Sequence, residues 1–432
     1  MHSELTEKQV RWRMRIFTLS WLAYAGFYLV RKNLSVIKPE LTEADVGLTD
    51  NEFALITGGY SLFYAMGQFF NGVLSDRYGA RLIVSLGLFL SVLMNLTMGF
   101  MYALPYVFLT LVCLNGLGQS TGWSGLVKMM ACWFRPQERG VVMAWWGTNY
   151  VLGGFFATLF ATFCMYRLPF FANLGWQRGF WIPALMLAGI AMLYALYSRD
   201  DCTSAGVPEI VHEHVVDGDK EAVIGEEDHP GSWSIILDVI RQPAVWLIAL
   251  MYFFLKLTRY SFLFWLPDYM HTHLLYTKEM SGYTSSVYEL VGFAGAVSAG
   301  YFSDKLFQSR RMPVGALMLW ALAIMFFLHP TIAQWGFWGN AIGIALIGYF
   351  TYGPDTLMTG AGAQDAATKR GAATAAGFIN GIGSCGQFFA GFVTAYVKNT
   401  YGWDALFYLF GVMVLIGGLI LAPKWNYRAV SD

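Results

Sequence analysis

The chain has 432 residues, of which 56% are hydrophobic, 17% aromatic and only 13% charged, and its formal net charge is zero. This composition is too apolar for a water-soluble globular protein and indicates an integral membrane protein. The balanced charge provides no basic surface, which excludes a nucleic acid as the expected partner.

Apolar runs long enough to cross a hydrocarbon core of about 30 Å recur along the chain. They lie at 16–37, 53–74, 82–103, 105–134, 141–166 and 179–198, and, after a polar interval, at 244–270, 281–302, 313–332, 338–363, 372–397 and 403–422. Runs of this length favour helices, because a membrane-spanning strand needs only about 9 to 11 residues. We therefore predict an all-α membrane protein with twelve transmembrane helices in two six-helix bundles.

Basic residues gather at the N-terminus and in every second turn between these runs. They are Lys8, Arg11, Arg13, Arg15, Arg77, Arg81, Arg135, Arg139, Lys305, Arg310, Arg311, Lys369, Arg370, Lys424 and Arg428. With twelve spans all of them fall on one side, which the positive-inside rule makes cytoplasmic. We predict a multi-pass protein of the cell inner (plasma) membrane with both termini in the cytoplasm. The first run lacks the cleavage site of a secretory signal, so we expect it to be retained.

The two halves of the sequence repeat one another. Positions 228 residues apart carry the same residue in the pairs Tyr24 and Tyr252, Arg31 and Arg259, and Asp76 and Asp304. The repeat predicts an N-terminal bundle at 1–198 and a C-terminal bundle at 243–432, joined by an acidic cytoplasmic linker at 199–242. In proteins with parallel repeats of this kind, the substrate site lies where the two bundles meet. The bundles rock against each other, and the site opens to one side of the membrane and then to the other.

Two arginines lie inside apolar runs at equivalent positions of the repeat. A charge at bilayer depth costs at least several kcal/mol, so such residues usually face a cavity. Arg31 alone could instead extend to the interface, but the equivalent Arg259 favours a functional pair. Two guanidinium groups facing each other suit a phosphate or a carboxylate. Lys32 lies about 100° further round the helix, and we expect it to reach the interface.

Further charged residues accompany Arg259 in the second half. Lys256 precedes it by three residues and shares its helix face. Asp355 follows Gly353-Pro354, which predicts a break in the helix, and its carboxylate is either a partner for Lys256 or a contact for a cationic group of the substrate. Glu289 or Asp355 could also carry a proton.

The spacing Gly72-x3-Asp76-Arg77-x-Gly79-x-Arg81 resembles the cytoplasmic turn motif of the major facilitator superfamily. The resemblance implies that Asp76 caps its helix and pairs with a neighbouring one, while Arg77 and Arg81 lock one state of the transport cycle. Asp304 takes the place of Asp76 in the second half. We count Lys128, in the fourth run, with these gating or structural residues.

A narrower resemblance covers nearly the whole chain. The segments "YLVRKN", "LTRYSFLFWLPDYM" and "TYGPDTLMTG" are similar to the organophosphate:phosphate antiporter family. The resemblance implies that Arg31 and Arg259 hold the phosphate. It also implies that Glu289 forms a structural pair within the C-terminal bundle. It also implies cavity-lining roles for Tyr24, Tyr28, Tyr64, Trp123 and Tyr352.

The sequence departs from this family at two expected site positions. Gln68 stands where the family has a lysine, and Tyr150 (or, by a one-residue ambiguity, Asn149) stands where it has a histidine. The cavity therefore carries less positive charge than in the relatives. Together with Asp355 and many aromatic residues, this admits a zwitterionic phosphodiester such as glycerophosphocholine as well as a simple phosphorylated compound.

The resulting prediction is a secondary active transporter that moves a small organic phosphate by alternating access, in exchange for inorganic phosphate. We expect it to act as a monomer in the lipid bilayer, without cofactor or metal. The alternatives are a membrane sensor of external organophosphate and a proton-coupled symporter of another organic anion. The sequence contains no nucleophile elbow, metal-ligand cluster or Walker loop, so an enzyme is not expected.

Overall fold

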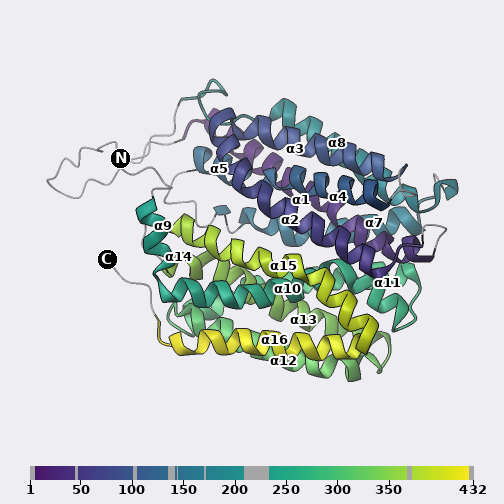
Figure 1. Ribbon diagram of the computed structural model, residues 1–432. Coiled ribbons are helices and arrows are strands. Elements are labelled where there is room, and N and C mark those ends of the chain that lie inside the picture. The colour runs from purple at the N-terminus through teal and green to yellow at the C-terminus, as the bar shows by residue number, and fades with distance from the viewer. Residues whose placement is uncertain are drawn as a thin grey trace. The chain divides into compact units, whose positions relative to one another are not determined.

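The computed structural model describes residues 5–43, 47–100, 105–134, 142–143, 145–169, 172–208, 233–366 and 372–427, and every regular element within these ranges is a helix (Figure 1). Of the linker predicted at 199–242, residues 209–232 lie outside these ranges. The chain divides into two compact units. This division does not test the predicted bundle boundaries, which stay a prediction.

Unit 1 comprises residues 1–214 together with 264–286. Its helices are α1 (Glu7–Glu43), α2 (Asp50–Tyr78), α3 (Ala80–Met98), α4 (Pro105–Gln119), α5 (Thr121–Trp133), α7 (Thr148–Tyr166), η1 (Ala172–Gln177) and α8 (Arg178–Tyr197). The segment 264–286 adds the end of α10 (Pro243–Thr272) and the start of α11 (Lys278–Lys305). Helix α1 contacts α7 and α8 extensively, which places Arg31 among several helices.

Unit 2 comprises residues 215–263 and 287–432. Besides most of α10 and α11 it contains α9 (Trp233–Ile240), α12 (Arg311–Ala333), α13 (Phe337–Leu357), η2 (Met358–Gly362), α14 (Ala363–Asp365), α15 (Ala372–Tyr401), α16 (Trp403–Leu421) and η4 (Ala422–Lys424). Helix α12 packs against both α13 and α16.

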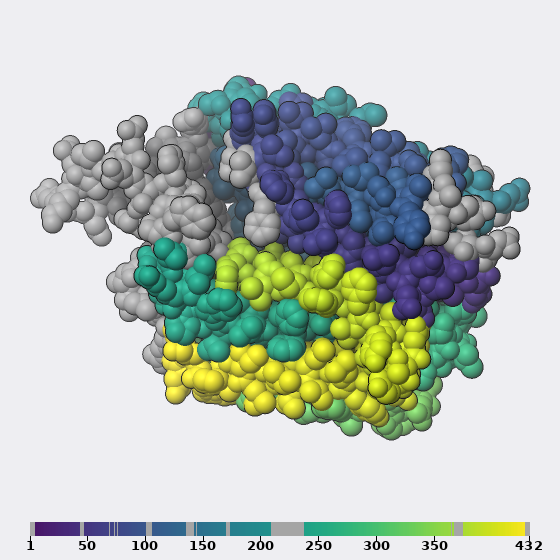
Figure 2. Space-filling view, in the orientation of Figure 1, coloured from purple at the N-terminus to yellow at the C-terminus, as the bar shows by residue number. Residues whose placement is uncertain are grey.

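Each of the twelve predicted runs coincides with helical residues among those that the structure describes. Within these residues, six helical stretches are long and apolar enough to cross a bilayer by length and composition alone. Helix α16 is one of them, and Val412, Ile416 and Leu419 expose apolar side chains along it (yellow in Figure 2). Exposed apolar side chains on a spanning helix are the surface that lipid tails cover.

The turn between α2 and α3 depends on a glycine and an acid. Gly79 has φ 88°, a conformation that side-chain-bearing residues rarely adopt. A Cβ there would also lie 2.7 Å from Asp200 Oδ2. Asp200 Oδ1 accepts a hydrogen bond of 2.7 Å from the backbone N–H of Arg81, and so satisfies a free donor at the start of α3.

The helix break expected at Gly353-Pro354 is wrong. Helix α13 continues through Pro354 to Leu357, and a π-helical turn, η2, follows at Met358–Gly362. Proline removes one backbone donor but does not end a helix whose neighbours hold it in place. The uninterrupted helix keeps Asp355 on the same element as Tyr352.

Candidate functional site

Arg31 is buried in unit 1, with 3% of the residue exposed. Three tyrosine rings surround its guanidinium carbon, which lies 4.5 Å from the ring centre of Tyr28, 5.1 Å from that of Tyr64 and 5.8 Å from that of Tyr60. Aromatic faces attract a cation but do not neutralise it. The site therefore holds a positive charge without a carboxylate partner among the described residues.

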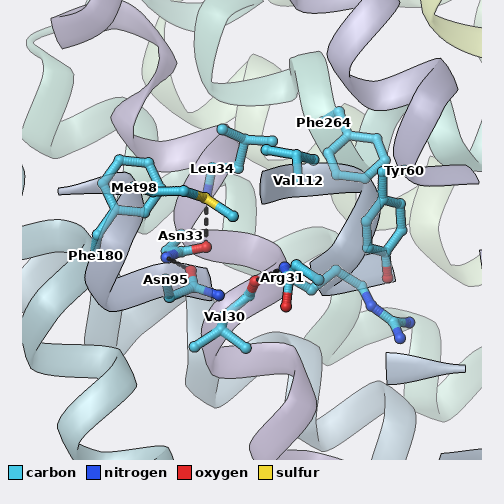
Figure 3. Close-up of a pocket in the computed structure, with 11 residues that line it drawn as sticks. Val30, Arg31, Asn33, Leu34, Tyr60, Asn95, Met98, Val112, Phe180 and Phe264 are labelled. Carbon is cyan, nitrogen blue, oxygen red and sulfur yellow. Dashed lines mark hydrogen bonds between the residues drawn. The ribbon is translucent and has the colours of Figure 1, made fainter. Parts of the chain in front are cut away.

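The nitrogens of the Arg31 guanidinium differ in their hydrogen bonding. Its Nε donates a hydrogen bond of 2.8 Å to Gln119 Oε1, which also accepts a bond of 2.9 Å from the hydroxyl of Tyr60. Nη2 of Arg31 is buried and has no hydrogen-bond partner among the described residues. Arg31 and Tyr60 lie at one side of a small cavity lined also by Asn33, Asn95 and other residues of unit 1 (Figure 3). A buried donor without a partner is a natural contact for an anionic ligand.

Two further predicted site residues of unit 1, Tyr24 and Trp123, form an aromatic cluster with Tyr28, which also packs against Arg31. The rings of Tyr24 and Trp123 lie 5.5 Å apart, and Tyr24 also lies 6.1 Å from Tyr28. Gln68 is partly buried in α2, and Tyr150 is partly buried in α7 and packs against the hydrophobic core. These two departures from the family pattern therefore lie on helices of the same unit as Arg31.

Lys32 is buried, with 2% of the residue exposed, so the prediction that it reaches the interface is wrong. The expectation assumed that the helix face next to Arg31 meets lipid. Helix α1 is in fact covered on several sides, and every residue from Phe27 to Pro39 is buried. A lysine in the middle of a covered helix has no route to the surface.

In unit 2, Arg259 forms a buried ion pair with Asp355. Arg259 Nη1 lies 3.0 Å from Asp355 Oδ2, and 6% of Arg259 and 3% of Asp355 is exposed. The guanidinium carbon of Arg259 lies 4.7 Å from the ring centre of Tyr352 and 5.8 Å from that of Tyr260. Both arginines thus lie among tyrosines, but only Arg259 has a carboxylate beside it in the part of the chain that the structure describes.

Lys256 lies one helical turn before Arg259 and is also buried. Its Nζ donates hydrogen bonds of 2.9 Å to Asn380 Oδ1 and 3.0 Å to Ser384 Oγ, both on α15. Two buried cations one turn apart on α10 therefore accompany the carboxylate of Asp355 on α13. The formal charges of this group sum to one positive charge, which favours an anionic ligand.

The predicted gating or structural residues lie at several places. Arg81 Nε donates to the carbonyl oxygen of Ala195 at 3.0 Å, and Lys128 Nζ donates to that of Ser75 at 2.9 Å. Asp304 pairs with Arg311. Glu289 is buried in α11, Arg77 is exposed at the end of α2, and the side chain of Asp76 lies outside the described residues.

Sequence reasoning missed a buried ion cluster in unit 1. Lys38 Nζ lies 3.0 Å from Asp50 Oδ1 and 2.5 Å from Asp268 Oδ2, and only 1% of the Lys38 side chain is exposed. The same Nζ lies 4.5 Å from the ring centre of Trp265 and 5.3 Å from that of Phe53. The cluster joins the end of α1 to the start of α2 and the end of α10.

A second, more exposed set of ion pairs continues this cluster. Glu43 Oε1 lies 2.7 Å from His271 Nε2, and Lys278 Nζ lies 2.8 Å from Glu43 Oε2 and 3.1 Å from Glu40 Oε2. Hydrogen bonds from Lys278 and then from His271 lower the pKa of the Glu43 carboxyl. These contacts hold the end of α1 against the start of α11.

The internal repeat contains a signal that could have identified these contacts. Glu43 and His271 are 228 positions apart, the offset of the repeat, and Pro39 and Pro267 share that offset. Lys38 and Asp268 each lie next to one of these prolines. Opposite charges at equivalent positions of the repeat, or next to them, are therefore candidates for a contact.

Comparison with known proteins agrees with this architecture. Residues 20–390 match the Major Facilitator Superfamily. The chain is 30% identical to the glycerol-3-phosphate transporter of Bacillus subtilis over 436 residues, covering 98% of this chain and 95% of that protein. It is 27% identical to a probable hexose phosphate transport protein of Chlamydia pneumoniae, covering 98% and 93%. It is 28% identical to the membrane sensor protein UhpC of Salmonella typhimurium, again covering 98% and 93%.

A solved structure supports the fold alone. The inward-facing, unoccupied crystal structure of a bacterial homolog of the human lysosomal transporter Spinster matches with a TM-score of 0.71 and 16% identity, covering 96% of each chain. The prediction of an all-α membrane fold is confirmed. The family match confirms a multi-pass membrane protein of a transporter family rather than an enzyme. The chain belongs to the major facilitator superfamily and, within it, to the organophosphate:phosphate antiporter family.

Proposed function

We propose that this protein moves a small organic phosphate across the membrane by alternating access, and that Arg31 and Arg259 together hold its phosphate. The observation that carries the proposal is the pair of buried arginines at equivalent positions of the repeat, each among tyrosine rings. A buried cation is costly unless something compensates it. A phosphate oxygen in contact with the unpartnered Nη2 of Arg31 would provide that compensation.

Inorganic phosphate is the counter-substrate that we propose. It presents the same oxyanion to both arginines as an organic phosphate does, so one site can carry either ligand in alternate directions. The names of the glycerol-3-phosphate and hexose phosphate relatives support an organophosphate as the other ligand. We also propose that the protein acts as a monomer in the cell inner membrane, with both termini in the cytoplasm.

Exchange by the purified protein in liposomes tests this function. Liposomes loaded with inorganic phosphate are expected to take up labelled glycerol-3-phosphate or another organophosphate, and phosphate-free liposomes are not. Uptake that needs no internal phosphate but follows an imposed pH gradient would replace exchange with proton-coupled symport. Absence of uptake for every organophosphate offered, under both conditions, would reject transport.

Asp355 supports a finer substrate proposal, a zwitterionic phosphodiester such as glycerophosphocholine. When a phosphate binds Arg259, the carboxylate of Asp355 gains an anionic neighbour within a buried site, and a cationic group on the same substrate would offset that repulsion. Tyr252, Tyr260 and Tyr352 provide aromatic faces near these charges, and such faces attract a quaternary ammonium group.

Replacing Asp355 with asparagine is the matching prediction. The variant is expected to take up glycerophosphocholine about tenfold less efficiently relative to glycerol-3-phosphate, because the loss of one ionic contact costs roughly 1.5 kcal/mol. Competition between the two compounds for labelled phosphate exchange measures the ratio. An unchanged ratio, or equal uptake of both compounds by the unaltered protein, would remove the proposed preference for a zwitterionic phosphodiester.

A membrane sensor of external organophosphate is the second candidate, supported by the 28% identity to the sensor protein UhpC over almost the whole chain. Transport and sensing both need the same ligand site, so the presence of the two arginines does not distinguish a transporter from a sensor. Saturable organophosphate binding by the purified protein, without exchange in liposomes, would favour the sensor.

A further inference from the structure

Helix α1 changes conformation one residue before Arg31. Val30 has φ −104° and ψ 15°, outside the helical region, although the helix continues on both sides. In a regular helix the carbonyl oxygen of Val30 would accept from the N–H of Leu34. That N–H donates to the side-chain oxygen of Asn33 at 2.8 Å (Figure 3). The irregular turn therefore leaves the Val30 carbonyl available to another helix.

Helix α4 provides the donors for this carbonyl. Asn115 Nδ2 donates to the Val30 oxygen at 3.1 Å, and Gln119 Nε2 donates to it at 3.3 Å. Gln119 Nε2 also donates to Asn115 Oδ1 at 3.2 Å. Both hydrogens of the Gln119 amide nitrogen are thus directed at acceptors, and a backbone carbonyl is an acceptor that cannot change its role.

The orientation of the Gln119 amide is consequently fixed. Its nitrogen faces two acceptors, and its oxygen faces two donors, Arg31 Nε at 2.8 Å and the Tyr60 hydroxyl at 2.9 Å. Rotating the amide by 180° would place its N–H groups against the guanidinium and its oxygen against the Val30 carbonyl. All of the groups concerned are buried, so every such mismatch would be costly.

We propose that Gln119 is a positioning residue for substrate binding. It holds the guanidinium of Arg31 through Nε and so directs the two Nη groups, of which Nη2 has no partner among the described residues, at the substrate oxyanion. A neutral amide does this without cancelling the charge of Arg31, which a carboxylate at the same position would do. The inference rests on the proposed function, because it concerns the same arginine.

Kinetics of three purified variants in phosphate-loaded liposomes test this role. Gln119→Leu removes the acceptor of Arg31 Nε and is expected to raise the KM for glycerol-3-phosphate about tenfold, which corresponds to about 1.4 kcal/mol, with a smaller change in turnover. Gln119→Asn keeps the amide on a shorter side chain and should recover part of the loss. Trp133→Phe is the control, because it removes a hydrogen bond of unit 1, from the buried Trp133 to the carbonyl oxygen of Arg199 at 3.1 Å, that does not involve Arg31.

Gln119→Glu gives a readout that a merely structural role would not produce. The ionised carboxylate would pair with Arg31 and compete with the substrate oxyanion for it, so Gln119→Glu should weaken substrate binding more than leucine does, although it keeps the shape of the side chain. A KM for folded Gln119→Glu that is no higher than that of Gln119→Leu would overturn the proposal.

The remaining outcomes separate the positioning role from the function itself. If Arg31→Gln abolishes exchange while folded Gln119→Leu keeps the KM of the unaltered protein, the positioning role is rejected and the proposed function stands. If Arg31→Gln has no effect on exchange, both are rejected. Thermal unfolding of each variant in detergent shows whether it is folded before its kinetics are compared.

Discussion

Replacing Arg31 or Arg259 with glutamine is expected to lower organophosphate uptake about 100-fold or more. Hydrogen bonds to charged groups contribute roughly 1.5–3 kcal/mol each, and the glutamine removes both the charge and the paired N–H groups. Arginine-to-lysine variants keep the charge but lose the planar fork, so they should retain only a small part of the activity. Initial rates of labelled uptake into phosphate-loaded liposomes measure the effect.

Arg11→Gln is the matched control for these variants. Arg11 lies on the same helix as Arg31, but it is exposed and pairs with Glu7 one turn away. Exposed pairs contribute little, about 0–1 kcal/mol, so its uptake should stay within about twofold of the unaltered rate. Normal uptake by Arg31→Gln and Arg259→Gln would remove the basis of the proposed site.

Replacing Lys38 with methionine is expected to cause the largest loss of stability among single changes in unit 1. The change leaves the carboxylates of Asp50 and Asp268 without their shared cation, and 2% of the Asp268 side chain is exposed. Removing one partner of a buried ion pair typically costs about 3–5 kcal/mol. The apparent melting temperature of the purified protein in detergent should therefore fall by several degrees, in line with the usual relation of stability to melting temperature.

A second substitution shows whether the lost stability comes from the unpaired charge or from altered packing. Adding Asp268→Leu to Lys38→Met removes the most deeply buried unpaired carboxylate, so the double variant should be more stable than Lys38→Met alone. Asp50 can remain charged, because its side chain is 20% exposed. A double variant whose loss equals the sum of the two single losses would show that the ion pair is not the source of the stability.

Much of the architecture could be predicted because it depends on composition and periodicity. The twelve apolar runs coincide with helices, and Arg31 and Arg259 drew attention because a charge in an apolar run is costly and here occurs twice at one offset. Pro354 misled the prediction, since proline disfavours a helix locally but packing can hold the helix through it.

Other features of the site depend on distances that a sequence does not contain. Asp355 could be assigned to Lys256 or to the substrate, and only the geometry places it 3.0 Å from Arg259. Gln119 drew no attention, because an uncharged residue in an apolar run is common and its role comes from the irregular turn at Val30. Lys38 lies at the end of its run, where a lysine usually reaches the interface.

Binding stoichiometry tests the central claim most directly, that one oxyanion is held by an arginine from each repeat. Calorimetric titration of the purified protein with glycerol-3-phosphate should give one site per chain, and both Arg31→Gln and Arg259→Gln should weaken that same site. Two sites per chain, each lost in only one variant, would contradict the claim, and so would either variant binding with the affinity of the unaltered protein.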